Sequence, residues 1–284
     1  MQAGAGKGDI MKRFLSVFLF ASLTGLGVGP VIADAELRLE RAPIDVRNTS
    51  SLQAGARTFV DYCQGCHSAS LMRYNRLADL GFSEQQIKDD LMFPADKKIG
   101  EMMDISMTKA DAKSWFGAAP PDLSMIARSR GADWLYAFLR SFYRDPLSST
   151  GWNNLAFERV GMPHALWPLQ GEPVLDLREF KTKEEAEAAQ IQAKSFSVVV
   201  ETEGESGGKE TTRYVLQSID VERPGAINQA KYDETVRDLV NFLVWLSEPT
   251  QVFRRQIGYA VVFFFLLLTL LTWFLYKEFW KDVH

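Results

Sequence analysis

Cysteine and histidine are scarce in this chain, which has two cysteines and three histidines in 284 residues. A zinc site needs four ligands, and only His164 and His284 stand outside the one motif described below, so such a site would be strained. Basic residues are also fewer than acidic ones. Residues 34–253 hold 25 Lys and Arg against 33 Asp and Glu, a net charge of −8. This balance argues against nucleic acid as a partner, and it suits either a basic protein partner or ordinary solubility charge.

Both cysteines fall in one short motif, Cys63-Gln64-Gly65-Cys66-His67. The pattern C-x-x-C-H is the attachment signature of c-type haem, in which the thiols add to the porphyrin vinyl groups and the histidine becomes the proximal iron ligand. A dithiol redox pair is one alternative, but it leaves His67 without a role, and a zinc site is another. The motif predicts one covalent haem c. Because no cysteine is left for a structural disulfide, packing and the haem must hold the domain together.

The N-terminus has the three parts of a secretory signal peptide. Residues 11–13, Met-Lys-Arg, supply positive charge, and residues 14–21 form an apolar run that is too short to span a membrane. Small residues stand at positions −3 and −1 of a cleavage site after Ala33, so the pattern predicts a signal peptide over residues 1–33. Residues 1–10 are polar and glycine-rich, which indicates that translation starts at the second methionine. Export agrees with the haem motif, because bacterial c-type haem is attached outside the cytoplasmic membrane.

The C-terminal region contains an uncharged run of twenty residues, IGYAVVFFFLLLTLLTWFLY, at positions 257–276. At about 1.5 Å per residue a helix of this length crosses a hydrocarbon core about 30 Å thick. A buried core helix is the alternative, but few are so long and so uniformly apolar. We expect a transmembrane anchor over residues 254–276. The signal peptide would then place the soluble domain, residues 34–253, in the periplasm and the tail, residues 277–284, in the cytoplasm, with the anchor in a bacterial inner membrane.

Hydrophobic periodicity and capping residues predict a mainly α-helical soluble domain. The expected helices cover residues 51–66, 83–91, 108–116, 133–143, 182–194 and 231–246, and the segments 195–202 and 211–219 predict a β-hairpin. Long irregular connections separate these elements. Such connections are uncommon without a reason, and a haem supplies one because its apolar faces act as a core around which loops fold.

An electron-transfer haem usually has a second axial ligand, and methionine raises the reduction potential where a second histidine lowers it. Met162 is our choice because it lies far from the haem motif in a stretch that contains Gly161 and Pro163. The alternatives are His164, Met102, Met103 and Met107. A partly buried haem propionate also needs a cationic partner, and either Arg128 or Arg130 suits this role.

Several segments occur in an order that resembles the cytochrome c1 family, the membrane-anchored haem subunit of ubiquinol–cytochrome c reductase. They are the early CQGCH motif, GAAPPDLSMIARSR at residues 117–130, VGMPHALWPLQG at residues 160–171 and FLVWLSEP at residues 242–249, followed by a single anchor. Many unrelated cytochromes share the haem motif, whereas the PPDLS, G-M-P and W-x-x-E-P segments are far more specific. The resemblance covers most of the mature chain.

The resemblance implies a class I cytochrome c-like haem domain with insertions. The hairpin is among these insertions, because it has no counterpart in the mitochondrial pattern. The implied haem contacts are covalent bonds to Cys63 and Cys66, axial bonds to His67 and Met162, packing by Pro120 and Pro121, Arg130 rather than Arg128 near a propionate, and Trp134 near the haem edge. The chain departs from the Met-Ala-Pro-Pro sequence of some members, because Pro163 and His164 follow Met162 here.

The function that the resemblance implies is a one-electron relay. The haem would accept an electron from a Rieske iron–sulfur protein and pass it to a soluble cytochrome c or similar carrier. Quinol oxidation would take place on a cytochrome b partner in a dimeric complex, so this subunit would have no independent catalytic site. The alternatives are a stand-alone anchored cytochrome that serves another terminal enzyme, an exported thiol module without haem, and a catalytic haem with an open sixth position.

Overall fold

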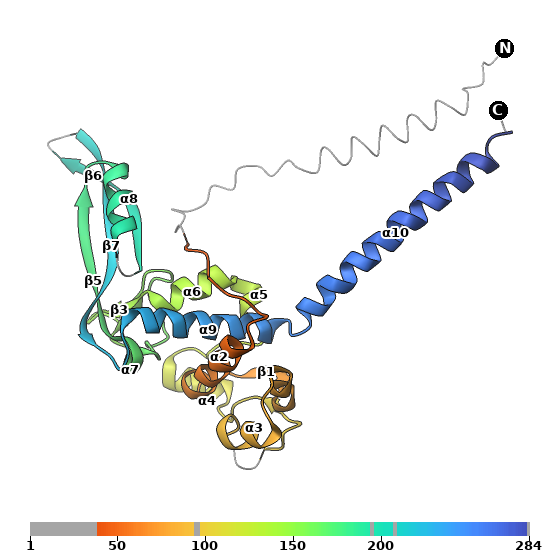
Figure 1. The fold of residues 1–284 in the computed structure, drawn as a ribbon. Helices are drawn as coiled ribbons and strands as arrows, with labels where there is room; N and C mark the ends of the chain where they lie inside the picture. The colour runs from red at the N-terminus through yellow and green to blue at the C-terminus, as the bar shows by residue number, and fades with distance from the viewer. Residues whose placement is uncertain (1–38, 94–96, 194–195, 207–208, 283–284) are drawn as a thin grey trace. The chain divides into compact units, whose positions relative to one another are not determined.

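The computed structural model describes residues 39–93, 97–193, 196–206 and 209–282. The predicted signal peptide at residues 1–33 lies outside the described residues, as does His284. More of the described residues lie in helices than in strands, as the sequence predicted (Figure 1). Strands are nevertheless more extensive than the single expected hairpin, so "mainly α" describes the protein only approximately.

Two helices from opposite ends of the soluble domain lie side by side and form the centre of the main hydrophobic core (Figure 1). Helix α2 (Thr49–Tyr62) begins at Asn48, whose side chain accepts a hydrogen bond from a backbone amide of the first turn. Helix α9 (Gln229–Ser247) is the longest helix of the domain. The rings of Phe59 and Phe242 meet between the two helices, with centroids 5.5 Å apart. The first expected helix therefore exists, but it ends at Tyr62 rather than at residue 66.

Shorter elements fill the chain between these two helices. They are β1 (Ala69–Arg73), η1 (Tyr74–Leu80), α3 (Glu84–Asp90), β2 (Met102–Met103), α4 (Lys109–Phe116), α5 (Ile126–Arg130), α6 (Ala132–Arg140), β3 (Phe142–Arg144), β4 (Trp152–Asn154) and α7 (Trp167–Gln170). The predicted capping box of Ser83 and Gln86 is present at the start of α3. The expected helix 133–143 ends early because residues 142–144 pair with β4, whose Asn154 side chain donates to the carbonyl of Phe138 at 2.8 Å.

A three-stranded antiparallel sheet, with strand order β5-β7-β6, forms the second part of the domain. Its elements are β5 (Gly171–Phe180), α8 (Lys183–Gln192), β6 (Ser197–Ser206) and β7 (Lys209–Pro224). The predicted hairpin is confirmed as β6 and β7, but strand β5 was not expected, because Pro173 and the charged residues of this segment disguise its alternation. Helix α8 lies against the sheet (Figure 1), and Phe196, Val198 and Ile219 pack with Ala137 of α6 in a small second core.

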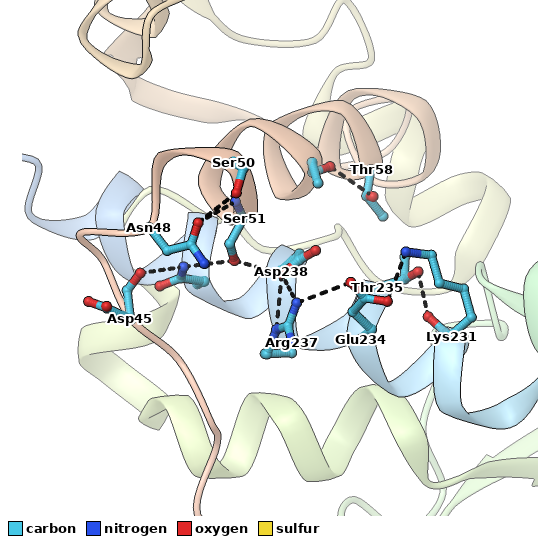
Figure 2. Close-up of polar contacts among 12 residues, drawn as sticks. Asp45, Asn48, Ser50, Ser51, Thr58, Lys231, Glu234, Thr235, Arg237 and Asp238 are labelled. Carbon is cyan, nitrogen blue, oxygen red and sulfur yellow. Dashed lines mark hydrogen bonds and ion pairs between the residues drawn. The ribbon is translucent and has the colours of Figure 1, made fainter.

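Buried polar groups join α2 to α9 where the two helices are closest (Figure 2). The Ser51 hydroxyl donates to Asp238 Oδ1 at 2.6 Å, and Asn241 Nδ2 donates to Ser51 Oγ at 2.9 Å. The Arg237 guanidinium donates to the same Asp238 oxygen at 2.8 Å. Gly55 permits this approach, because a Cβ at that position would lie only 2.0 Å from the carbonyl oxygen of Asp238.

Helix α10 (Gln251–Phe279) follows α9 after the short link Glu248–Thr250. Among the described residues it is the one helix long and apolar enough to cross a membrane. No residue in the most apolar part of α10 is buried in the protein. A buried core helix, the alternative for this segment, would have most of these residues covered. The helix contains the whole expected anchor, residues 254–276.

Replacing Gly55 with alanine should force α2 and α9 apart. We expect the free energy of unfolding to fall by about 1–3 kcal/mol, the usual cost of overpacking a core. Urea denaturation of the detergent-solubilised protein measures this change. Gly100→Ala is the matched control, because a Cβ at Gly100 would meet nothing within 4 Å. Equal stability of the two variants would show that the close helix contact does not limit stability.

Candidate haem-binding site

The C-x-x-C-H motif forms a tight turn directly after α2. The amides of Cys66 and His67 both donate to the carbonyl of Cys63, at 3.1 and 2.9 Å. Both thiols are free; Cys63 is buried and Cys66 is exposed. The Gln64 side chain donates to the hydroxyl of Tyr74 at 2.6 Å and so fixes the turn to η1, a contact that the sequence analysis did not foresee. The turn keeps both thiols available for covalent attachment.

His67 is held in the tautomer that a metal ligand needs. The ring is buried, and Nδ1 lies 2.7 Å from the carbonyl oxygen of Pro121. Because a carbonyl oxygen only accepts hydrogen bonds, Nδ1 carries the proton. Burial lowers the pKa of His67, so the ring is neutral and the lone pair of Nε2 is free. Metal-ligating histidines typically have this second-nitrogen contact to a carbonyl or carboxylate.

The segment that supplies the Pro121 carbonyl is itself tied to the chain after the motif. The amide of Leu123 donates to the carbonyl of Ser68 at 2.8 Å. Asp122 Oδ2 accepts hydrogen bonds from both the amide and the hydroxyl of Ser70, at 2.8 and 2.7 Å. Partial burial alone would raise the pKa of Asp122, but hydrogen bonds from Ser124 and Ser70 lower it, so the carboxylate stays charged. Pro120 and Pro121 therefore belong to a braced segment beside His67.

Met162 is half-buried and packs against the main core, to which Cys63 also belongs. A Cβ at the neighbouring Gly161 would meet nothing within 4 Å, so this side of the loop is open. Of the alternative methionines, Met103 is fully buried among core residues, and Met102 lies in β2, where it pairs with β1. Met107 is half-buried just before α4.

His164, the alternative ligand, lies deep in an aromatic part of the core. It is 2 % exposed, and its ring stacks on Phe142 with centroids 4.9 Å apart. Its Nε2 lies 2.8 Å from Gln170 Oε1, and burial lowers the pKa of His164 to about 4, so the ring is neutral. Phe142 and Trp152 enclose the His164 ring in the core, which favours Met162 over His164.

The two candidate arginines differ in their surroundings. Arg130 lies over the ring of Trp134, with its guanidinium carbon 5.0 Å from the ring centroid, and Trp134 stacks on Phe138. Arg128 instead forms an ion pair with Glu248 at 3.6 Å. Arg130 has no carboxylate partner among the described residues. Arg130 is therefore the better candidate of the two for a propionate partner.

The geometry disfavours the two alternatives that need no haem, a dithiol redox pair and a zinc site. Reactive C-x-x-C thiols have lowered pKa values, often at a helix N-terminus. Here the motif follows a helix C-terminus, and burial together with Cys66 raises the pKa of Cys63 to about 12. The described residues hold no cluster of three or more His, Cys, Asp or Glu side chains able to bind a metal ion. Two free thiols, one prepared imidazole and a half-buried thioether are the donors that a haem c requires.

Comparisons with known proteins show the family to which the chain belongs. The model of the Cytochrome C1 family matches residues 41–172 and 223–283. The chain is 40 % identical over 275 residues to the ammonia monooxygenase gamma subunit of Nitrosomonas europaea, covering 96 % of this chain and 100 % of the relative. It is 40 % identical over 274 residues to cytochrome c1 of Allochromatium vinosum, with 96 % and 99 % covered. Mitochondrial cytochrome c1 of Schizosaccharomyces pombe is 25 % identical over 253 residues, with 82 % and 67 % covered.

Replacing Arg130 with glutamine should lower the midpoint potential of the haem. Loss of a cation beside a propionate leaves more negative charge near the iron and so stabilises the oxidised form. We expect a fall of up to about 60 mV, which is one tenfold step for a one-electron couple. Redox titration measures it. Arg128→Gln is the matched control and should change the potential less; an equal effect of both variants would contradict the assignment of Arg130.

Proposed function

Because this chain belongs to the cytochrome c1 family, we propose that it carries one haem c, attached through Cys63 and Cys66, and transfers single electrons in a cytochrome bc1-type complex. The observation that carries the proposal is the neutral His67 ring, whose Nδ1 is fixed by the Pro121 carbonyl at 2.7 Å and whose Nε2 is left for iron. The bound haem supplies a one-electron carrier. The residues of the chain attach it, orient it and set the polarity around it.

Met162 is the second axial ligand in this proposal. Its half-buried side chain lies on an irregular loop and packs against the core that contains Cys63. His164 and Met103 are less suited, because both side chains are buried in the core and the His164 ring stacks on Phe142. A thioether ligand raises the reduction potential relative to a second imidazole, and a relay to a soluble cytochrome c needs a raised potential.

The proposed path of the electron runs from a Rieske iron–sulfur protein through this chain to a soluble cytochrome c. Cytochrome b would oxidise the quinol in the same dimeric complex, so the residues of this chain move no protons. Helix α10 would anchor the domain at the periplasmic face of the inner membrane. The exposed apolar surface of α10 supports the anchor, and the resemblance to the haem subunit of ubiquinol–cytochrome c reductase supports the partners.

A second candidate function is an anchored cytochrome that delivers electrons to a different enzyme. The similarity to a protein named ammonia monooxygenase gamma subunit favours it. The two functions share the haem and the ligands but differ in the proteins that purify with the chain.

Stepwise reduction of the chain purified from membranes in mild detergent tests the two functions. We expect a c-type absorption band after addition of ascorbate, because Met ligation gives a high potential, and b-type bands after addition of dithionite. A c-type band without any b-type band would favour the second candidate. A colourless preparation would contradict both.

Replacing Met162 with histidine should keep the haem attached and lower its potential markedly, because imidazole stabilises ferric iron more than a thioether does. Haem-stained denaturing gels check the attachment, and redox titration checks the potential. Met103→His is the control, because Met103 is a fully buried core residue. An unchanged potential in the Met162 variant would show that another residue binds the iron.

A further inference from the structure

We propose that two buried side chains, Asn154 and His164, are positioning residues that hold the methionine loop, residues 155–163, and so keep the Met162 thioether on the iron. The inference rests on the proposed function, in which Met162 is the sixth ligand. It assigns the holding of that ligand to two polar anchors, one at each end of the loop, that do not contact the iron.

The methionine loop has little regular structure of its own. Residues 155–163 contain no helix or strand, and Phe157, Arg159 and Gly161 are exposed. Arg159 has a φ of +56°, a conformation that non-glycine residues rarely adopt. A loop with this backbone does not fix a side chain by its own regular structure, so its contacts with the rest of the protein must determine where Met162 lies.

Asn154 anchors the first end through both atoms of its amide. Its side chain is buried, and Oδ1 accepts hydrogen bonds from the amides of Ala156 and Phe157 at 2.8 and 3.0 Å. The same oxygen accepts from the hydroxyl of Ser141 at 3.0 Å, while Nδ2 donates to the carbonyl of Phe138 at 2.8 Å. One side chain thus joins the start of the loop to the end of α6.

The neighbouring Asn153 supports the strained part of the loop. Its Oδ1 accepts a hydrogen bond from the amide of Arg159 at 2.8 Å, and its Nδ2 donates to Asp145 Oδ2 at 2.9 Å. The left-handed conformation of Arg159 is therefore held by a buried partner rather than by local sequence preference.

His164 anchors the second end. Its ring stacks on Phe142, lies edge-on to Trp152, and is joined by Nε2 to Gln170 Oε1 at 2.8 Å. The side-chain nitrogen of the same residue, Gln170 Nε2, is buried and has no hydrogen-bond partner among the described residues. The hydrogen bond to Gln170 and the two ring contacts together fix the chain at His164, directly after the loop.

Both anchors act on the same short segment, residues 138–142, where α6 passes into β3. Asn154 binds the carbonyl of Phe138 and the hydroxyl of Ser141, and His164 stacks on Phe142. The two ends of the loop are therefore fixed to one rigid part of the protein. Loss of either anchor frees one end and increases the fraction of molecules in which Met162 has left the iron.

The experiment uses the full chain purified with its haem from membranes and carries Asn154→Ala. We measure the sulfur-to-iron charge-transfer band of the oxidised form and the binding of carbon monoxide to the reduced form. Carbon monoxide binds only where Met162 has left. We expect its binding at a fixed concentration to rise about tenfold or more. Asn154→Ala removes two hydrogen bonds to loop amides, and the loss of even one buried hydrogen bond shifts an equilibrium by roughly tenfold. We also expect the band to weaken.

Asn241→Ala is the matched control. Asn241 is also a fully buried asparagine, and its Nδ2 donates to Ser51 Oγ and to the carbonyl of Asp45, but it joins α2 to α9 rather than the methionine loop. The control should lower thermal stability and leave both the band and carbon monoxide binding unchanged. Asn154→Ala behaving like the control would overturn the inference, since the anchor would then be structural only.

His164→Phe provides a second test and decides the matter if Asn154→Ala fails to fold. Phenylalanine keeps an aromatic ring against Phe142 and removes the hydrogen bond to Gln170. Increased carbon monoxide binding by this variant supports the inference, and wild-type binding overturns it for His164. A wild-type protein that lacks the charge-transfer band and binds carbon monoxide readily would instead contradict Met162 as ligand, and this result is distinct from unchanged variants.

Discussion

The contact between α2 and α9 is the constraint on which the rest of the structure depends. Helix α2 ends in the haem motif, and α9 continues through a three-residue link into the apolar helix α10. Gly55 brings the two backbones together, and Ser51 and Asp238 share a buried hydrogen bond of 2.6 Å beside it. A charged carboxylate at this depth is tolerated because Ser51 and Arg237 both donate to it. The position of the haem motif relative to the chain that enters the anchor is therefore set by one helix pair.

The sequence was sufficient where structure follows from local chemistry. The capping box at Ser83 and the apolar run of α10 each depend on residues close together in the chain, and each was predicted with its element. Helix ends were predicted less well. The helix that begins near residue 132 was expected to continue past Arg140, because its apolar periodicity continues. It ends there because the side-chain amide of Asn154, on a later strand, donates to a carbonyl of its last turn. Strand β5 was missed because its partner β7 lies some forty residues further along the chain.

Some residues of the candidate site could likewise be predicted from the sequence, and others could not. Cys63, Cys66 and His67 could be named from spacing alone. Met162 was preferred for its distance from the motif and its neighbours Gly161 and Pro163, but the alternative ligands stayed open until the resemblance implied Met162. The carbonyl of Pro121 was beyond sequence reasoning, because any residue offers a carbonyl and only the fold brings this one to His67. Asn154 lies in no motif, and the sequence suggested His164 only as an alternative iron ligand. Their importance comes from burial and from partners on α6 and β3, which is information that only three-dimensional contacts contain.

The sheet of β5, β6 and β7 shows how an insertion can leave such a site intact. The family match is interrupted between residues 172 and 223, while the two relatives with 40 % identity align along nearly the whole chain. The two ends of the insertion meet at Gly171 and Gly225, where the amide of Gly225 donates to the carbonyl of Gln170 at 3.1 Å. A Cβ at Gly171 would lie 2.0 Å from the carbonyl oxygen of Arg223, so only glycine permits this closure. Because the chain leaves and returns at nearly one point, the insertion need not displace Gln170 or the His164 ring that it holds.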